Sequence, residues 1–168
     1  MRLYVVQHGE AVEKQKDPDR PLSEKGMADI ECLADFLKDI EVAVHCIYHS
    51  GKTRAMQTAE TLARGVRLEG DIEQCDLLNP CDPPAPFIEL MNAGGKDLLV
   101  AGHLPFVSKL VSSLVIGDEG HGVVNFQPGC AVCVESDEDG DWKVAWMTRP
   151  ELLYTQDRTH RKSRTDKD

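Results

Sequence analysis

Short apolar runs that stop at chemically useful residues constrain this chain more than any other feature of its sequence. The runs that start at Leu3 and Leu98 lead to His8 and His103, and each histidine stands beside a glycine. A third run leads through a short turn to Arg54. Such runs are typical of buried strands, whose ends would present two histidines and an arginine at the edge of a sheet.

Helical patterns separate these runs along the chain. Ser23 is placed to cap a helix whose apolar residues recur at close to 3.6-residue spacing. The alternation predicts an α/β fold, a three-layer sandwich whose central, mostly parallel sheet has helices on both faces. A polar stretch at residues 136–141 predicts that the last two strands form a C-terminal antiparallel hairpin. The expected helices cover residues 23–39, 53–64, 86–92 and 105–115, and the expected strands cover residues 3–7, 45–49, 72–77, 97–101, 130–135 and 142–148.

The length of 168 residues suits one ordinary domain. We expect a single domain over residues 1–155 and a polar tail over residues 156–168, which is basic because it has five Lys or Arg against three Asp. The formal net charge of the whole chain is −10, which argues against nucleic acid or an anionic membrane as a partner. A small anionic substrate stays open, because a few local cations can dominate inside a cleft.

The N-terminus leads directly into a strand rather than an apolar leader, and no segment approaches transmembrane length. We therefore expect a cytoplasmic protein. No long heptad pattern is present, so we also expect a monomer.

Six cysteines lie mostly within apolar runs, which is typical of buried free thiols. Cys130 and Cys133 form a C-x-x-C motif, yet residues three apart in a strand point to opposite faces of the sheet. The pair therefore could not share a metal, and we expect neither a metal site nor a cofactor.

The carboxyl ends of parallel strands meet at one edge of a sheet, and open α/β folds bind their ligands there. His8, Arg54 and His103 would all lie at this edge. Helices that begin near residues 53 and 105 would aim their positive ends at the same cleft. Because a cation is unfavourable in the first turn of a helix, the position of Arg54 suggests a functional reason.

The three residue types suit phosphoryl transfer. A neutral His8 imidazole could attack phosphorus, and Arg54 could hold two phosphoryl oxygens in its planar fork. His103, if protonated, could donate to another oxygen. Each residue alone also has a structural interpretation, but their matching positions at three strand ends favour the joint one.

The motifs around these residues resemble those of the histidine phosphatase superfamily, the phosphoglycerate-mutase-like enzymes. Residues 7–11, Gln-His-Gly-Glu-Ala, resemble its Arg-His-Gly motif. Residues 50–58, Ser-Gly-Lys-Thr-Arg-Ala-Met-Gln-Thr, resemble its Ser-Pro-x-x-Arg-Ala-x-Gln-Thr motif, and residues 102–103 its Gly-His pair. The motifs have the order and spacing of the family, and the likeness extends over residues 1–150.

Within the superfamily the chain is most similar to the small SixA-type phosphohistidine phosphatases. Only 44 residues separate Thr58 from His103, which leaves no room for the helical insertion of larger members. Residues 20–26, Arg-Pro-Leu-Ser-Glu-Lys-Gly, and residues 102–105, Gly-His-Leu-Pro, also resemble segments of this subgroup.

The resemblance implies that His8 becomes transiently phosphorylated and that Arg54 and His103 belong to the phosphate pocket. It also implies that neither metal nor cofactor takes part. The remaining residues that it assigns to substrate binding are Gln7, Gly9, Arg20 at the mouth of the pocket, Ser50 and Gly102.

Gln7 departs from the family, which has an arginine at this position. The change removes a permanent charge and a bidentate donor, and Gln7 retains only a neutral amide hydrogen bond. A loss of about 2–4 kcal/mol from the transition state would slow turnover by roughly 30- to 1000-fold. Arg20, Lys52 or a basic residue of the tail could compensate, and Gly51 in place of the family's proline should have a milder effect.

The sequence therefore favours a phosphohistidine phosphatase that acts on signalling proteins through a phospho-His8 intermediate. Its expected partners are phosphate and a protein that carries phosphohistidine. One alternative is a weakened member that binds phosphate or a phosphoprotein without turnover, and another is a phosphatase of small phosphate esters. No general acid is obvious, and Glu10 is near His8 only in sequence. This favours phosphohistidine, whose leaving imidazole can be protonated from solvent.

Overall fold

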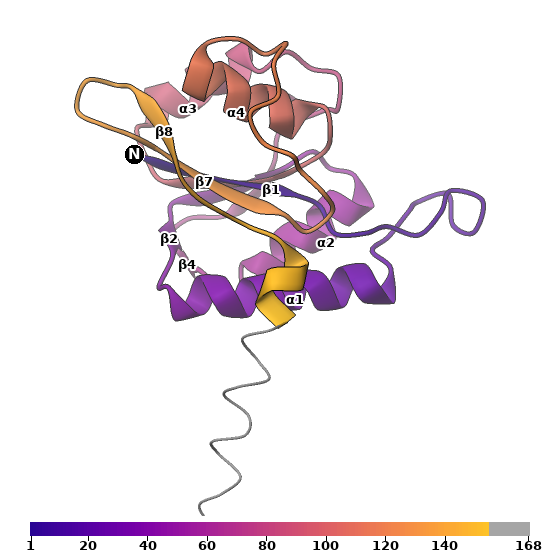
Figure 1. The fold of residues 1–168 in the computed structure, drawn as a ribbon. Helices are drawn as coiled ribbons and strands as arrows, with labels where there is room; N and C mark the ends of the chain where they lie inside the picture. The colour runs from indigo at the N-terminus through magenta and orange to yellow at the C-terminus, as the bar shows by residue number, and fades with distance from the viewer. Residues whose placement is uncertain (155–168) are drawn as a thin grey trace, which may run out of the picture.

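A six-stranded sheet at the centre of the molecule is covered by helices on both faces (Figure 1). The computed structural model describes residues 1–154. The strand order is β5-β3-β6-β1-β7-β8. The first four strands are parallel to one another, and β7 pairs antiparallel with both of its neighbours, β1 and β8. The strands are β1 (Arg2–Gln7), β3 (Cys46–His49), β5 (Ile72–Gln74), β6 (Leu98–Gly102), β7 (Ala131–Ser136) and β8 (Trp142–Thr148). The predicted three-layer α/β sandwich with its C-terminal hairpin is confirmed.

The helices form the two outer layers. In Figure 1, α1 (Glu24–Asp39) and α2 (Thr53–Leu62) lie below the sheet, whereas α3 (Ala85–Gly94) and α4 (Phe106–Ile116) lie above it. Each layer encloses its own buried cluster, because successive residues of β1 point to opposite faces: Tyr4 packs in one cluster and Leu3 in the other.

The N-cap and the apolar face predicted for α1 are both present in the structure. The Ser23 hydroxyl caps the helix by accepting a hydrogen bond from the Gly26 N–H at 3.0 Å. The apolar residues spaced along the helix are buried against the sheet, and they include Ile30, Leu33 and Leu37. The amphipathic pattern therefore sets both the position and the orientation of α1.

The strand register brings the functional segments to one edge of the sheet. Gln7 at the end of β1 pairs with Gly102 at the end of β6, and His49 at the end of β3 pairs with Ala101. The His8 N–H extends the first pairing, because it donates to the Gly102 carbonyl at 3.0 Å. The residues that follow these three strands consequently lie side by side.

Several local features differ from the sequence prediction. β2 (Ala43–Val44) and β4 (Arg67–Leu68) form a separate two-stranded sheet that was not predicted, because two residues show no periodicity. The predicted strand over residues 72–77 ends at Gln74. A helical turn at residues 150–154 was also not predicted, and the predicted basic tail lies outside the described residues.

Cys130 and Cys133 are both buried, and they belong to the clusters on opposite faces of the sheet. This confirms that the two thiols of the C-x-x-C motif do not converge. Within residues 1–154, no group of three or more His, Cys, Asp or Glu side chains is arranged to hold a metal ion. No helix in this part of the chain is long and apolar enough to cross a bilayer.

Candidate active site

His8 lies directly after β1 and has hydrogen-bonding partners at both ring nitrogens. Its Nδ1 is 2.7 Å from the Gly9 carbonyl oxygen, and its Nε2 is 3.2 Å from the Arg54 Nε. A carbonyl can only accept and a guanidinium can only donate. Nδ1 therefore carries the proton, and Nε2, which accepts from Arg54, has the lone pair that could attack an electrophile.

The surroundings of His8 keep its imidazole neutral. Burial lowers the pKa of His8 to about 4, and the charges of Arg54 and Arg20 lower it further, against the opposing effect of the Gly9 carbonyl. At neutral pH the ring thus carries a single proton and has no charge. A neutral imidazole with a defined tautomer is the state in which histidine can attack phosphorus.

Arg54 is held against His8 by the first turn of α2. The Thr58 hydroxyl donates to the Arg54 carbonyl oxygen at 2.7 Å and accepts from the Gly9 N–H at 3.2 Å. Thr58 therefore ties the start of α2 to the backbone that follows His8. Burial and the charge of Arg20 lower the pKa of Arg54, but a guanidinium keeps its charge at any working pH.

His103 lies beside His8 at the end of β6. The two ring centroids are 4.8 Å apart, and the ring planes are inclined by 59°. His103 is only 2% exposed, and its Nε2 is 2.5 Å from the Ser50 hydroxyl oxygen. Two imidazoles and one guanidinium that are far apart in the sequence are thus brought together.

The protonation state of His103 differs from the one considered from the sequence. Burial lowers its pKa to about 3, and coulombic interactions with His8, Arg54, Lys52 and Arg20 lower it further. The ring is consequently neutral near pH 7 in the ligand-free protein. It donates from a single N–H unless a bound anion raises its pKa.

Gln7 is buried at the same strand end, with 7% of its surface exposed. Its Oε1 atom has no hydrogen-bonding partner within residues 1–154. The His103 Nδ1 is the other buried side-chain polar atom without a partner in this part of the chain. Both unpartnered atoms belong to the candidate site, so contacts within the described residues leave part of its hydrogen-bonding capacity unused.

The two glycines assigned to substrate binding also have a packing role. A Cβ atom at Gly9 would lie 2.8 Å from the Gly26 carbonyl oxygen, and one at Gly102 would lie 2.9 Å from the Val107 side chain. The close approach of the loop after β1 to the start of α1 therefore requires Gly9. Gly102 allows the first turn of α4 to pack on the end of β6.

The turn before α2 differs from the motif that it resembles. Gly51 has a φ of 80°, which a proline cannot adopt. The Gly51 N–H donates to the His49 Nδ1 at 3.1 Å, a bond that proline could not make. The turn that places Ser50 and Arg54 is therefore held by a hydrogen bond instead of a pyrrolidine ring.

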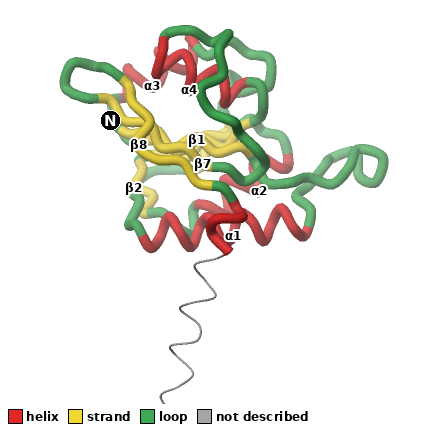
Figure 2. The backbone as a smooth tube through the Cα atoms, in the orientation of Figure 1, coloured by secondary structure: helices red, strands yellow, loops and turns green. Residues whose placement is uncertain are grey.

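Arg20 belongs to the long loop between β1 and α1, which projects from the body of the molecule (Figure 2). Its Nε donates to the Val12 carbonyl oxygen at 3.3 Å, which fixes the side chain along the loop. Its charge acts on His8, Arg54 and His103, whose pKa values it lowers. Arg20 thus adds positive potential to the site.

Two features of the site were not identified from the sequence. One is the bridging role of Thr58, although its place in the second motif was a signal. The other concerns Glu10, whose carboxylate accepts a hydrogen bond from the Ser23 hydroxyl at 2.8 Å. Glu10 is therefore engaged at the cap of α1.

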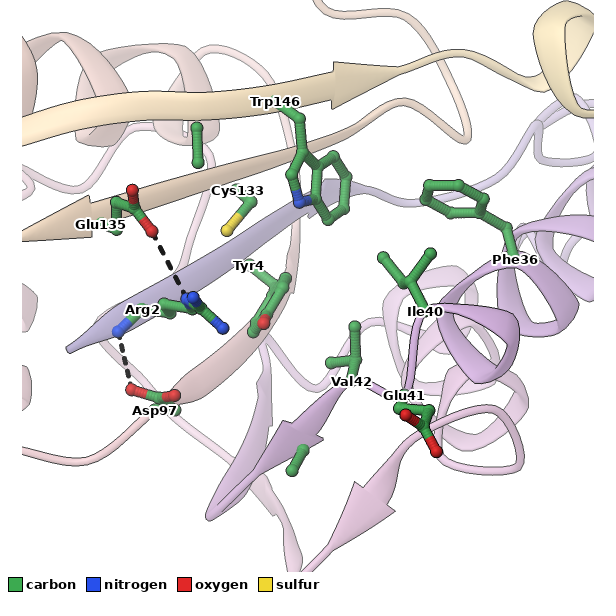
Figure 3. A pocket seen from close by; sticks show the side chains of 12 residues that line it. Arg2, Tyr4, Phe36, Ile40, Glu41, Val42, Asp97, Cys133, Glu135 and Trp146 are labelled. Atoms are coloured by element: carbon green, nitrogen blue, oxygen red, sulfur yellow. Dashed lines mark hydrogen bonds and ion pairs between the residues drawn. The ribbon is translucent and has the colours of Figure 1, made fainter.

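A second hollow lies at the opposite end of β1, between the C-terminal end of α1 and β8 (Figure 3). Its volume is about 510 Å³, and its walls include the aromatic rings of Phe36 and Trp146. The Arg2 side chain donates to Glu135 at 3.4 Å in this cavity. It contains neither histidine of the candidate site, so it is separate from the chemistry described above.

The comparisons with known proteins agree with this geometry. The family model described as "Histidine phosphatase superfamily (branch 1)" matches residues 3–79. Phosphohistidine phosphatase SixA of Escherichia coli is 29% identical over 155 residues, which cover 89% of this chain and 94% of the relative.

Two solved structures extend the similarity to the fold. The structure of the protein histidine phosphatase SixA complexed with tungstate matches with a TM-score of 0.78 at 29% identity, and covers 91% of this chain and 99% of that one. The α-ribazole phosphatase of Shigella flexneri matches with a TM-score of 0.69 at 16% identity, and covers 89% and 97% of the two chains. The second likeness concerns the fold alone.

Proposed function

This chain belongs to the histidine phosphatase superfamily, and we propose that it hydrolyses phosphohistidine on signalling proteins through a phospho-His8 intermediate. The observation that carries the proposal is the state of His8. Its Nε2 lone pair faces Arg54, its proton is held on Nδ1 by the Gly9 carbonyl, and its imidazole is neutral. The nucleophile is therefore prepared before any substrate arrives.

The reaction then proceeds in two transfers. The His8 Nε2 attacks phosphorus and forms a P–N bond, while the P–N bond of the substrate breaks and its imidazole takes a proton from solvent. Water then attacks the phosphorus of phospho-His8, which releases phosphate and restores the neutral ring. Arg54 stays close to the transferring group in both steps and stabilises the charge on its equatorial oxygens.

In this proposal Ser50 and Gln7 are further binding groups for the phosphoryl oxygens, and Arg20 contributes charge at the mouth. The amide of Gln7 supplies a neutral contact in place of a guanidinium. His8, Arg54 and His103 meet within a single chain, so a monomer is sufficient for the proposed chemistry.

Phosphohistidine is favoured over a phosphate ester because no carboxylate within residues 1–154 is among the groups that act on His8 or His103. Glu10 follows His8 closely, but its carboxylate is bonded to Ser23 at the cap of α1. An alkoxide leaving group needs a proton from the enzyme, whereas a departing imidazole can be protonated by water. Small esters stay as the alternative, since an α-ribazole phosphatase has the same fold.

The direct test is incubation with a protein that carries phosphohistidine, alongside a panel of small phosphomonoesters. We expect release of inorganic phosphate from the former, and an acid-labile phosphate on His8 that phosphorus NMR or mass spectrometry detects. Faster hydrolysis of an ester would contradict the proposed substrate class. Absence of both release and labelling would contradict the proposed activity.

A binding module without turnover is the remaining alternative, and it is motivated by Gln7. The Gln7→Arg variant separates the two cases. If the chain is a slowed enzyme, restoring the charge should raise turnover by about 10- to 1000-fold. If the wild-type protein binds phosphate and releases none from phosphohistidine, the module is the better description.

A further inference from the structure

Ser50 lies at a position from which it can control the proton of His103. Its hydroxyl oxygen and the His103 Nε2 are 2.5 Å apart, although the two residues are 53 positions apart in the sequence. Both side chains are buried, with 8% and 2% of their surfaces exposed. A short hydrogen bond in such surroundings is strong, because water does not compete for it.

The other nitrogen of the His103 ring restricts how this bond is polarised. Nδ1 is buried and has no partner within residues 1–154. The ring is neutral at neutral pH, so only one of its nitrogens carries a proton. If that proton were on Nδ1, a buried N–H would have no acceptor, which is rarer in proteins than an acceptor without a donor.

The proton therefore belongs on Nε2, where it is donated to the Ser50 oxygen. The hydroxyl hydrogen of Ser50 can then rotate toward another acceptor, whereas a ring N–H at Nδ1 has a fixed direction. Ser50 is bonded to the His103 ring, whose centroid is 4.8 Å from that of His8, so a phosphoryl group on His8 is the acceptor that we consider.

We propose that Ser50 relays the hydrogen-bonding capacity of His103 to the phosphoryl group that His8 receives. The inference rests on the proposed function and extends it by assigning Ser50 a contact with the phosphoryl group whose strength depends on His103. Donation from the imidazole N–H to the serine oxygen polarises the serine O–H, which makes it a better donor to a phosphoryl oxygen. No bond to hydrogen breaks, so the buried imidazole stabilises charge without being protonated.

The first experiment measures the tautomer and needs no turnover. Long-range proton–nitrogen spectra of nitrogen-15-labelled protein should show a protonated Nε2 and an unprotonated Nδ1 for His103, with His103→Asn used for assignment. Ser50→Ala should shift the ring toward the other tautomer. A wild-type ring with its proton on Nδ1 would overturn the relay, whether or not the protein is an enzyme.

The second experiment is a double-mutant cycle on phosphohistidine turnover. We expect Ser50→Ala to lower kcat by about 10- to 100-fold with little change in KM. The double variant with His103→Asn should be no slower than His103→Asn alone, because the serine acts with the histidine. Ser50→Thr keeps the hydroxyl and should recover most of the rate.

Additive losses in this cycle would show that Ser50 acts independently of His103 and would end the proposal. Ser112→Ala is the matched control, because Ser112 is also buried and its hydroxyl accepts from the Val123 N–H at 3.3 Å, away from the site. This variant should change neither the His103 tautomer nor kcat.

Discussion

The ends of β1 and β6 carry the same residue type in different surroundings. His8 is only half-buried, and both of its ring nitrogens are bonded, to Gly9 and to Arg54. His103 is almost fully buried, with one nitrogen bonded to Ser50 and the other unpartnered within the described residues. The two histidines therefore differ in accessibility and in hydrogen bonding, although neighbouring parallel strands present both rings, and this difference underlies the separate roles that we propose for them.

The largest effect should come from His8, because it is the proposed nucleophile. His8→Asn should lower turnover by about 10⁴-fold or more and abolish the acid-labile phosphate, because no other group can replace the Nε2 lone pair. His103→Asn should lower turnover less than His8→Asn does, and it should still permit the acid-labile phosphate to form on His8. Both are measured by phosphate release and by mass spectrometry of the protein quenched in base.

The exposed His121 supplies a control for this comparison, because its ring is bonded to Asp118 in a surface loop. His121→Asn should leave the rate unchanged. If His103→Asn abolished labelling and His8→Asn did not, the roles assigned to the two strand ends would have to be exchanged.

Arg54 should show the next largest effect, since it contacts the nucleophile and charges the site. Arg54→Ala should lower kcat/KM for phosphohistidine by about 10²- to 10³-fold, and Arg54→Lys should recover little because an ammonium lacks the planar fork. Arg64→Ala, an exposed change just beyond the same helix, is the control. Equal rates for the Arg54→Ala and Arg64→Ala variants would remove Arg54 from the mechanism.

Thr58 ties α2 to the loop after His8 and should affect stability more than chemistry. Thr58→Val leaves the Gly9 N–H without its acceptor, so the free energy of unfolding should fall by about 1–3 kcal/mol. Activity should fall only several-fold through the displaced Arg54. Thr61→Val, which also removes a buried hydroxyl from α2, is the matched variant for urea titration.

A Thr58→Val protein that is slower than Arg54→Ala would show that the loop after His8, and not the guanidinium, limits the reaction. Loss of activity in Thr61→Val as well would indicate a general dependence on the packing of α2.

The smallest expected effect is on the pH dependence of the free energy of unfolding. The pKa values of His8 and His103 in the folded protein, about 4 and about 3, lie below the ordinary value of 6.5. The unfolded chain therefore binds more protons between these limits, and the stability contributed by the neutral rings is lost as the pH falls from 6.5 toward 3.

Urea titrations between pH 7 and pH 4 should thus show a shallower loss of stability in His103→Asn than in the wild-type protein. His121→Asn should follow the wild-type curve. If the His103→Asn and wild-type curves were parallel, His103 would not be held neutral by burial.

Local patterns allowed much of the fold to be predicted. The N-cap at Ser23 and the apolar spacing of α1 act over a few residues, so they are readable without coordinates. The two-residue strands β2 and β4 were missed because their pairing depends on partners more than twenty positions apart. The same reason explains why Thr58 was not recognised as a bridge between Gly9 and Arg54.

The sequence by itself determined the layered fold and the meeting of His8, Arg54 and His103, because alternating strands and helices place successive parallel strand ends at one edge. Only the tertiary structure decided which nitrogen of His8 carries the proton, how far each histidine is buried, and that Ser50 faces His103. These properties arise from desolvation and from hydrogen bonds between distant segments, and such contacts exist only once the chain has packed.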